Sequence, residues 1–167
     1  NSVLQVHTKG LRLMNGNEYH TDTTVTAVAI GEQLVIAAFS DNFVRLFDQD
    51  LNMCVEKSIK NAHAFAFCKN SIAIATDPEE GGNSTVTLYT FDLNPTDDAG
   101  QLSSRAFAML FQQASMELFI STINGSVFRY IVGSSFSTSC AQIYSGEGYP
   151  LLLPYSDFVI IVTNDTF

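Results

Sequence analysis

The chain has 167 residues, the length of one ordinary domain, and 46% of them are hydrophobic whereas only 15% are charged. Its 17 acidic residues outnumber the 8 basic ones, which gives a formal net charge of −9. The basic residues occur singly: Lys9, Arg12, Arg45, Lys57, Lys60, Lys69, Arg105 and Arg129. Direct binding to nucleic-acid phosphates needs clustered lysine and arginine. The composition therefore excludes direct nucleic-acid binding by this segment and favours a protein partner.

The ends and the cysteines bear on where the protein functions. The sequence contains no signal peptide and no apolar run long enough to span a membrane. It begins without Met, and we expect it to be part of a longer polypeptide. Three cysteines, Cys54, Cys68 and Cys140, cannot all pair, and each lies in or beside an apolar run. We therefore expect reduced thiols in or near the core and a reducing compartment.

The predicted elements are strands from the first residues onward. The hairpin VLQV (3–6) and GLRLMN (10–15) opens the chain. Four later segments share an apolar alternating strand, a polar turn and a second alternating strand, the last one truncated: 32–48, 69–92, 116–132 and 156–167. A further apolar strand precedes each of the first three: 25–30, 62–67 and 105–111. The equivalent residues Val44, Val86 and Val127 are 42 and 41 residues apart, the period of a β-propeller blade.

This repeat predicts an all-β protein: a WD-repeat-like β-propeller with four-stranded antiparallel blades. Residues 1–167 would form about three blades plus flanking hairpins of one partial ring, with no second domain. Stacked sheets bury both faces, which explains why both alternating sets of side chains are largely apolar. Propellers close with four to eight blades, and an open stack would expose an apolar face at each end. We expect the remaining blades to come from chain outside this sequence or from another polypeptide.

No catalytic or metal-binding pattern emerges from the sequence. His7, His20 and His63 lie far apart and lack a cysteine or acid at ligand spacing, so we expect solvated or loop histidines. The sequence has no P-loop, no H-E-x-x-H and no G-x-S-x-G motif. We predict that the chain is not an enzyme and holds no catalytic residue, cofactor or metal.

Two acidic segments, DPEEGG (77–82) and NPTDDAG (94–100), are interpreted as solvated connections between strands. Their acids lack the alternating spacing of a calcium loop, and the alternative is contact with a partner's basic patch. Tyrosines flanking the apolar segment that follows residue 149 are candidate partner anchors, with core packing of at least one ring as the alternative. The candidate partner contacts are Asp77, Glu79, Glu80, Asp97, Asp98, Tyr149 and Tyr155.

Particular strands resemble a known family. Because the chain has no Trp, Phe47-Asp48 stands where WD repeats carry Trp-Asp. Residues 25–75 resemble the opening blades of the SepB-type propeller in the replisome adaptor family (acidic nucleoplasmic DNA-binding protein, or chromosome transmission fidelity factor). The shared features are the small-residue strand IAAFS, an R-L-F strand and a V-E-K run. Residues 108–131 and 149–162 are similar to later strands of that family, although the third blade's Gly-Pro is missing and Tyr149 replaces a Trp.

The resemblance implies a non-enzymatic hub in the nucleus that forms a homotrimer through its propellers. Such a hub couples the replicative helicase to DNA polymerase alpha–primase by binding short helical peptides. The family's peptide-binding bundle follows its propeller, so no client-binding residue is transferred to this chain.

Two alternatives stay open. Residues 3–17 resemble a strand pair of the triple-propeller family that includes the large subunits of damaged-DNA-binding protein and polyadenylation specificity factor. That resemblance implies an adaptor of a ubiquitin ligase in DNA repair, or of pre-mRNA splicing or polyadenylation machinery. The third hypothesis is a propeller enzyme whose site lies in blades outside the sequence.

Overall fold

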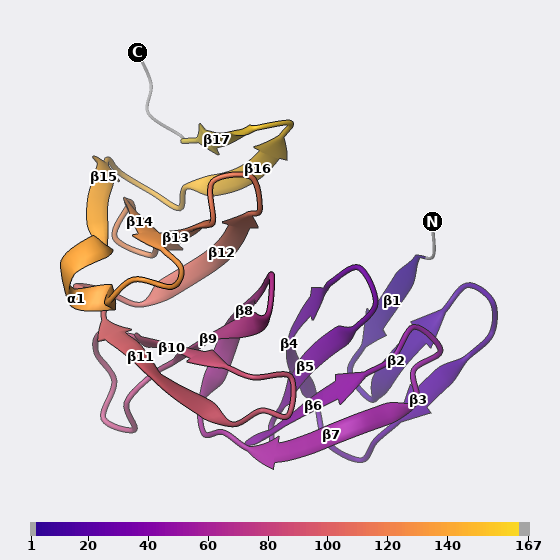
Figure 1. The fold of residues 1–167 in the computed structure, drawn as a ribbon. Helices are drawn as coiled ribbons and strands as arrows, with labels where there is room; N and C mark the ends of the chain where they lie inside the picture. Colours follow the sequence, from indigo (N-terminus) through magenta and orange to yellow (C-terminus); the bar gives the residue numbers. More distant parts are fainter. Residues whose placement is uncertain (1–2, 164–167) are drawn as a thin grey trace.

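A computed structural model describes residues 3–163, apart from the side chains of Asp97 and Asp98, as five antiparallel sheets (Figure 1). The first sheet comprises β1 (Leu4–His7), β2 (Gly10–Leu13) and β3 (Glu18–His20). The first blade comprises β4 (Val25–Ile30), β5 (Val35–Phe39), β6 (Phe43–Phe47) and β7 (Met53–Ser58). The second blade comprises β8 (Ala62–Cys68), β9 (Ser71–Thr76), β10 (Thr85–Tyr89) and β11 (Pro95–Gln101).

The third blade comprises β12 (Ala106–Gln112), β13 (Glu117–Thr122), β14 (Ser126–Ile131) and β15 (Ala141–Ser145). The short helix α1 (Phe136–Ser139) joins its last two strands. A final hairpin comprises β16 (Leu151–Tyr155) and β17 (Phe158–Val162). Among residues 3–163, no helix is long and apolar enough to cross a membrane.

The sheets are arranged as an open arc of propeller blades. The first strands of successive sheets, β4, β8, β12 and β16, contact one another and lie on the inner side, while each blade continues outward through its later strands (Figure 1). The described residues do not close into a ring. The predicted fold class, an all-β propeller with four-stranded antiparallel blades and only part of the ring, is confirmed.

The alternating pattern of β9 places this strand between two neighbouring sheets. In β9, Ile72 and Ile74 pack toward the first blade, whereas Ala73 and Ala75 pack toward the third. All four side chains are fully buried. Small alanines on one face let the sheets approach closely, so β9, the second strand of its blade, buries both of its faces.

The sequence predicted an exposed apolar face at both ends of the arc, but only one end has such a face. On the final hairpin, one face exposes six apolar side chains that pair across the strands: Leu151, Leu153, Tyr155, Phe158, Ile160 and Val162. On the first sheet, Leu11 and Leu13 are buried against the first blade, but the outer face carries the row Gln5, Arg12 and Glu18. Exposed apolar residues of that sheet are Val3, Val6 and Met14. The outer face of the first sheet is therefore largely polar.

Several segments depart from the sequence-based expectations. NPTDDAG (94–100), predicted to be a connection, lies mostly in β11, the outer edge strand of the second blade. Pro95 is compatible with this position because an edge strand does not need every N–H for its ladder. The sequence pattern indicated strands alone, and the one-turn helix α1 in the serine-rich segment 133–139 was not predicted. The truncated last strand predicted near residues 164–167 lies outside the described residues.

The cysteines give a testable result on burial. Cys68 is 4% exposed and Cys54 is exposed, and burial raises the pKa of the Cys68 thiol to about 12 and that of Cys140 to about 11. Thiolate is the reactive form, so iodoacetamide at about pH 8 should modify Cys54 rapidly and Cys68 only after unfolding in guanidinium. Equal rates for the two would contradict the packing.

The raised pKa of the Cys68 thiol also predicts how stability depends on pH. Between about pH 9 and pH 12 the thiol ionises in the unfolded chain but stays protonated in the folded protein. The free energy of unfolding should therefore fall as the pH rises through this range.

Candidate functional site: a polar cleft between the first two blades

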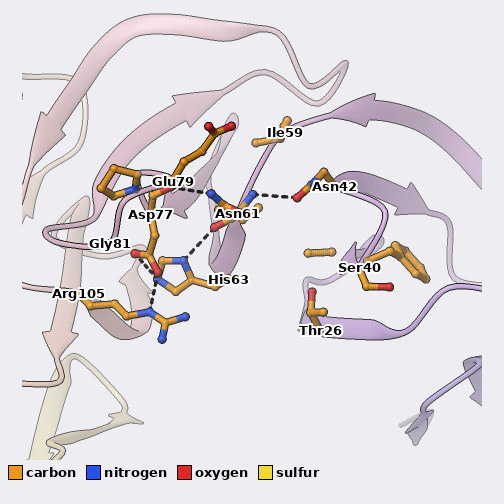
Figure 2. A pocket seen from close by; sticks show the side chains of 14 residues that line it. Thr26, Ser40, Asn42, Ile59, Asn61, His63, Asp77, Glu79, Gly81 and Arg105 are labelled. Atoms are coloured by element: carbon orange, nitrogen blue, oxygen red, sulfur yellow. Dashed lines mark hydrogen bonds and ion pairs between the residues drawn. The ribbon is translucent and has the colours of Figure 1, made fainter.

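A cleft of about 480 Å³ lies at the end of the sheets where the inner strands β4 and β8 begin (Figure 2). Its floor is small and apolar: Ala38, Phe39, Ile59 and Ala62. Polar side chains surround it, and they come from both blades and from the residue before β12: Thr26, Ser40, Asn42, Asn61, His63, Asp77, Glu79 and Arg105. The cleft is therefore a junction of three sheets rather than a feature of one.

The turn between β5 and β6 forms the first-blade wall of the cleft. Asn42 adopts a left-handed backbone conformation with φ of 64°, which short polar side chains tolerate in tight turns. Its carbonyl accepts a hydrogen bond from the Ile59 N–H at 2.9 Å, and its side-chain oxygen accepts one from the Asn61 N–H at 3.4 Å. These bonds fix the turn against the chain that leads into the second blade.

Asp77 is the centre of the opposite wall. The Ser84 hydroxyl donates to one carboxylate oxygen of Asp77 at 2.7 Å. Arg105 Nε lies 2.6 Å from the other carboxylate oxygen (Figure 2). The Asp77 N–H donates to the Asn61 carbonyl at 3.3 Å. Because Arg105 precedes the inner strand of the third blade, this carboxylate connects the second blade to the third.

His63 is largely buried in β8, which corrects the expectation of a solvated or loop histidine. Its side chain is 15% exposed. Nδ1 lies 3.2 Å from the Asn61 carbonyl oxygen, and Nε2 lies 3.2 Å from that of Ala106 in the third blade. The Asp77 carboxylate is 3.7 Å from Nε2. His63 thus bridges the same two blades as the Asp77–Arg105 pair.

Ser84, His63 and Asp77 are the residue types of a nucleophilic triad, but their geometry is different. In a triad the serine donates to histidine and the histidine donates to the acid. Here the Ser84 hydroxyl donates its proton to Asp77 at 2.7 Å and accepts from the Ala106 N–H at 2.8 Å. Its oxygen lies farther, 3.4 Å, from His63 Nε2. Ser84 is also fully buried. We conclude that these three residues form an interblade clamp.

The cleft has no metal-binding arrangement among the described residues, where no group of three His, Cys, Asp or Glu side chains converges. Glu79 forms an ion pair with Lys60 at 2.8 Å, and both side chains are exposed. The hydrogen bond and charge of Lys60 lower the pKa of Glu79. Exposed pairs of this kind contribute little to stability.

The structure brings only two of the candidate contacts together. Asp77 and Glu79 line the cleft, while Glu80 is exposed beside it. The side chains of Asp97 and Asp98 lie outside the described part of the chain.

The two tyrosines lie elsewhere. Tyr149 is 57% exposed, with its ring centroid 5.3 Å from that of Phe107, and Tyr155 is 66% exposed on the final hairpin. Nothing in the structure tests whether any of the seven residues contacts a partner, and those contacts stay predictions.

Sequence reasoning missed the cleft residues Asn42, Asn61 and Arg105. A positional signal exists for two of them. Asn61 and Arg105 each precede the inner strand of a blade, and the strand registers that follow, Ala62 with Thr76 and Ala106 with Thr122, are equivalent. Aligning the blades on these inner strands would have placed both side chains at the same end of the sheets.

Comparison with known proteins supports the fold. No protein-family profile matches the sequence, and no curated protein matches it. A solved chain of BBS1N, crystallised in complex with ARL6DN, matches 98% of this chain and 57% of its own length, with a TM-score of 0.73 and 10% identity. A chain of the mitotic checkpoint complex matches 92% of this chain and 51% of its own length, with a TM-score of 0.70 and 11% identity.

This chain therefore spans about half the length of each of these solved chains. Both neighbours are β-propeller proteins. At such low identity the likeness establishes the fold alone and does not identify the replisome adaptor family. The chain has the fold of a partial β-propeller.

Proposed function

We propose that the protein is a non-enzymatic scaffold and that the polar cleft binds a segment of a partner protein. The observation that carries this proposal is that hydrogen bonds between blades hold the cleft's polar groups in place. Asn42 and Asn61 are fixed to each other across the first and second blades, and Arg105 is fixed to Asp77 across the second and third. A preorganised site loses less entropy on binding.

The chemistry of the cleft suits an extended peptide. Amides at Asn42 and Asn61 and hydroxyls at Thr26 and Ser40 can exchange hydrogen bonds with a peptide backbone. Arg105 is 52% exposed and offers a positive charge at one end. The structural neighbours are consistent with this role, since one was solved in complex with ARL6DN and the other within the mitotic checkpoint complex.

Site-specific photo-crosslinking tests the proposal. A benzophenone amino acid replaces the cleft residue Thr26, which is exposed, in cells that make the protein naturally. We expect discrete protein adducts after irradiation, identifiable by mass spectrometry. The matched control places the same probe at Gln142, an exposed residue of the outer strand β15. Adducts that are absent at Thr26, or identical at both positions, count against a partner in the cleft.

Within the scaffold class we propose a nuclear adaptor of the replisome that couples the helicase to DNA polymerase alpha–primase. The support is the resemblance of residues 25–75 to the SepB-type propeller, together with the acidic charge of the chain. Sedimentation of the complete gene product should give a homotrimer, and a fluorescent fusion should enter the nucleus. A monomer, or exclusion from the nucleus, would argue against this assignment.

The triple-propeller family remains the second candidate because residues 3–17 resemble its strand pair. This candidate predicts many more blades encoded on both sides of the sequence, and the length of the complete gene separates the two.

A further inference from the structure

A second recess lies at the opposite end of the sheets, where the inner strands β4, β8 and β12 finish. It consists of two adjoining cavities of about 610 and 430 Å³ that share Gly31, Glu32, Phe67, Phe111 and Gln113. Three phenylalanines from the second and third blades line the larger cavity, and the buried Phe65 lines the smaller one. We call the recess the phenylalanine groove after the three: Phe67, Phe91 and Phe111. The polar cleft lies at the other end of the same strands.

The groove exposes apolar surface to solvent. Phe91 follows β10 and is 38% exposed, and Ile30 at the end of β4 is 61% exposed. Phe67 and Phe111 are half-buried, so each presents part of its ring to the recess. Gly31 keeps this surface accessible, because a Cβ there would lie 2.8 Å from the Phe67 ring. Concave aromatic surface of this kind is typical of sites that receive an apolar side chain.

The charges at the rim of the groove indicate the charge of the segment that it would bind. Glu32 has no ion pair among the described residues, and Asp48 lies on the same rim. Hydrogen bonds from the Asn52 side chain and backbone, which outweigh the small effect of burial, lower the pKa of Asp48. The one basic residue lining the groove is Lys69. With a chain net charge of −9, the rim attracts a cationic group and repels an anionic membrane surface.

We propose that the phenylalanine groove binds a short segment of a partner protein in which an apolar side chain lies next to a lysine or arginine. The apolar side chain inserts among the three phenylalanine rings, and the cation pairs with Glu32 and Asp48. Gln33 and Gln113 at the rim offer amides for the backbone of the segment. A cation near Phe91 gains a further attraction from the ring face.

This inference rests on the proposed scaffold function, and it adds a second docking surface to it. One scaffold with recesses at both ends of its sheets can hold two partner segments at once. Holding two segments together raises their effective concentration, and hence the avidity of the assembly.

The test uses a random-peptide phage library as the probe and the purified protein as the target. We expect enriched peptides to share a Phe, Leu or Met beside a Lys or Arg. Fluorescence polarisation then measures the affinity of one synthetic enriched peptide. Phe91→Ser and Glu32→Lys should each raise its Kd about tenfold or more, and salt should weaken binding to the native protein. Phe91 lies outside the described core clusters, so Phe91→Ser should keep the native melting transition.

The matched control is Glu80→Lys, the same charge reversal on an exposed acid at the opposite end of the sheets. It should leave the Kd of the peptide within about twofold of the native value.

Peptides that lack the shared pattern, or that bind the Phe91→Ser variant with unchanged Kd, overturn the groove proposal. If enriched peptides respond to Thr26→Lys instead, the groove proposal fails while the scaffold function holds. If no peptide is enriched, the groove proposal fails, and the Thr26 crosslinking result decides the scaffold function separately. Self-association that Phe91→Ser abolishes would make a second copy the occupant and overturn the proposal.

Discussion

Replacing Arg45 with methionine is expected to lower the free energy of unfolding by about 3 kcal/mol. The Arg45 side chain is 10% exposed, and its guanidinium contacts Asp41 Oδ2 at 2.7 Å and Glu56 through Nε. Its Cζ lies 4.4 Å from the centroid of the Phe39 ring. Methionine has an unbranched apolar side chain and leaves the carboxylates of Asp41 and Glu56 without their shared cation. Chemical denaturation followed by circular dichroism measures the loss.

Arg129→Met is the matched control, because Arg129 also lies on the third strand of a blade. Its side chain is 44% exposed and its ion pair with Glu117 is 3.4 Å long, so the change should cost less than about 1 kcal/mol. Equal losses for the two variants would mean that the buried cation of the first blade has no special role.

Acid provides a second measurement on the Arg45 cluster. Burial opposes ionisation of Asp41, but hydrogen bonds from Arg45 and from the Phe43 N–H, with the Arg45 charge, outweigh it and lower the pKa of Asp41. The stabilisation is therefore complete above the ordinary pKa of aspartate, about 3.9, and is lost as the pH falls below that value. The native protein should lose stability more steeply with acid than Arg45→Met does.

The second strand of the second blade was predictable from the sequence because its local pattern and its final environment agree. Ile72 to Ala75 alternate in size, and both faces of β9 are buried between two neighbouring sheets. The edge strand β11 was not predictable in the same way, because Pro95 and the glycine and acids around it are typical of turns. Pairing with β10 overrides that local preference. An outer strand packs against few other residues, so its amino-acid composition gives little indication that it is a strand.

The recesses could be predicted only in part. Asp77 was identified because it begins an acidic run. Its partner Ser84 faces it across the β9–β10 hairpin, but its partner Arg105 meets it only after the blades have stacked. The expectation of a solvated His63 failed for the same reason, since the Ala106 carbonyl that it faces belongs to another blade. A single sequence describes each strand and its turn well. Contacts between blades depend on the angle at which neighbouring sheets meet, and no short motif encodes that angle.

Replacing Asp77 with alanine is expected to lower the free energy of unfolding by about 2–3 kcal/mol, because it leaves the buried Ser84 hydroxyl without its charged acceptor. The Arg105 guanidinium also loses its ion pair across the blades. The Asp77→Ala and Arg105→Ala single variants and their double variant form a thermodynamic cycle. We expect a coupling energy of about 1 kcal/mol, measured by denaturant titration, since Arg105 is half exposed and solvent screens the pair.

Glu80→Ala is the control for this cycle, because it removes a neighbouring acid that is exposed to solvent. It should change the free energy of unfolding by less than about 0.5 kcal/mol. If Asp77→Ala matched Glu80→Ala, Asp77 would be a solvated connection, as its place in an acidic run suggests. If the expected difference is observed and Asp77→Ala also reduces crosslinking at Thr26, the clamp holds the cleft in its binding shape. A loss of stability with unchanged crosslinking would assign Asp77 to joining the blades alone.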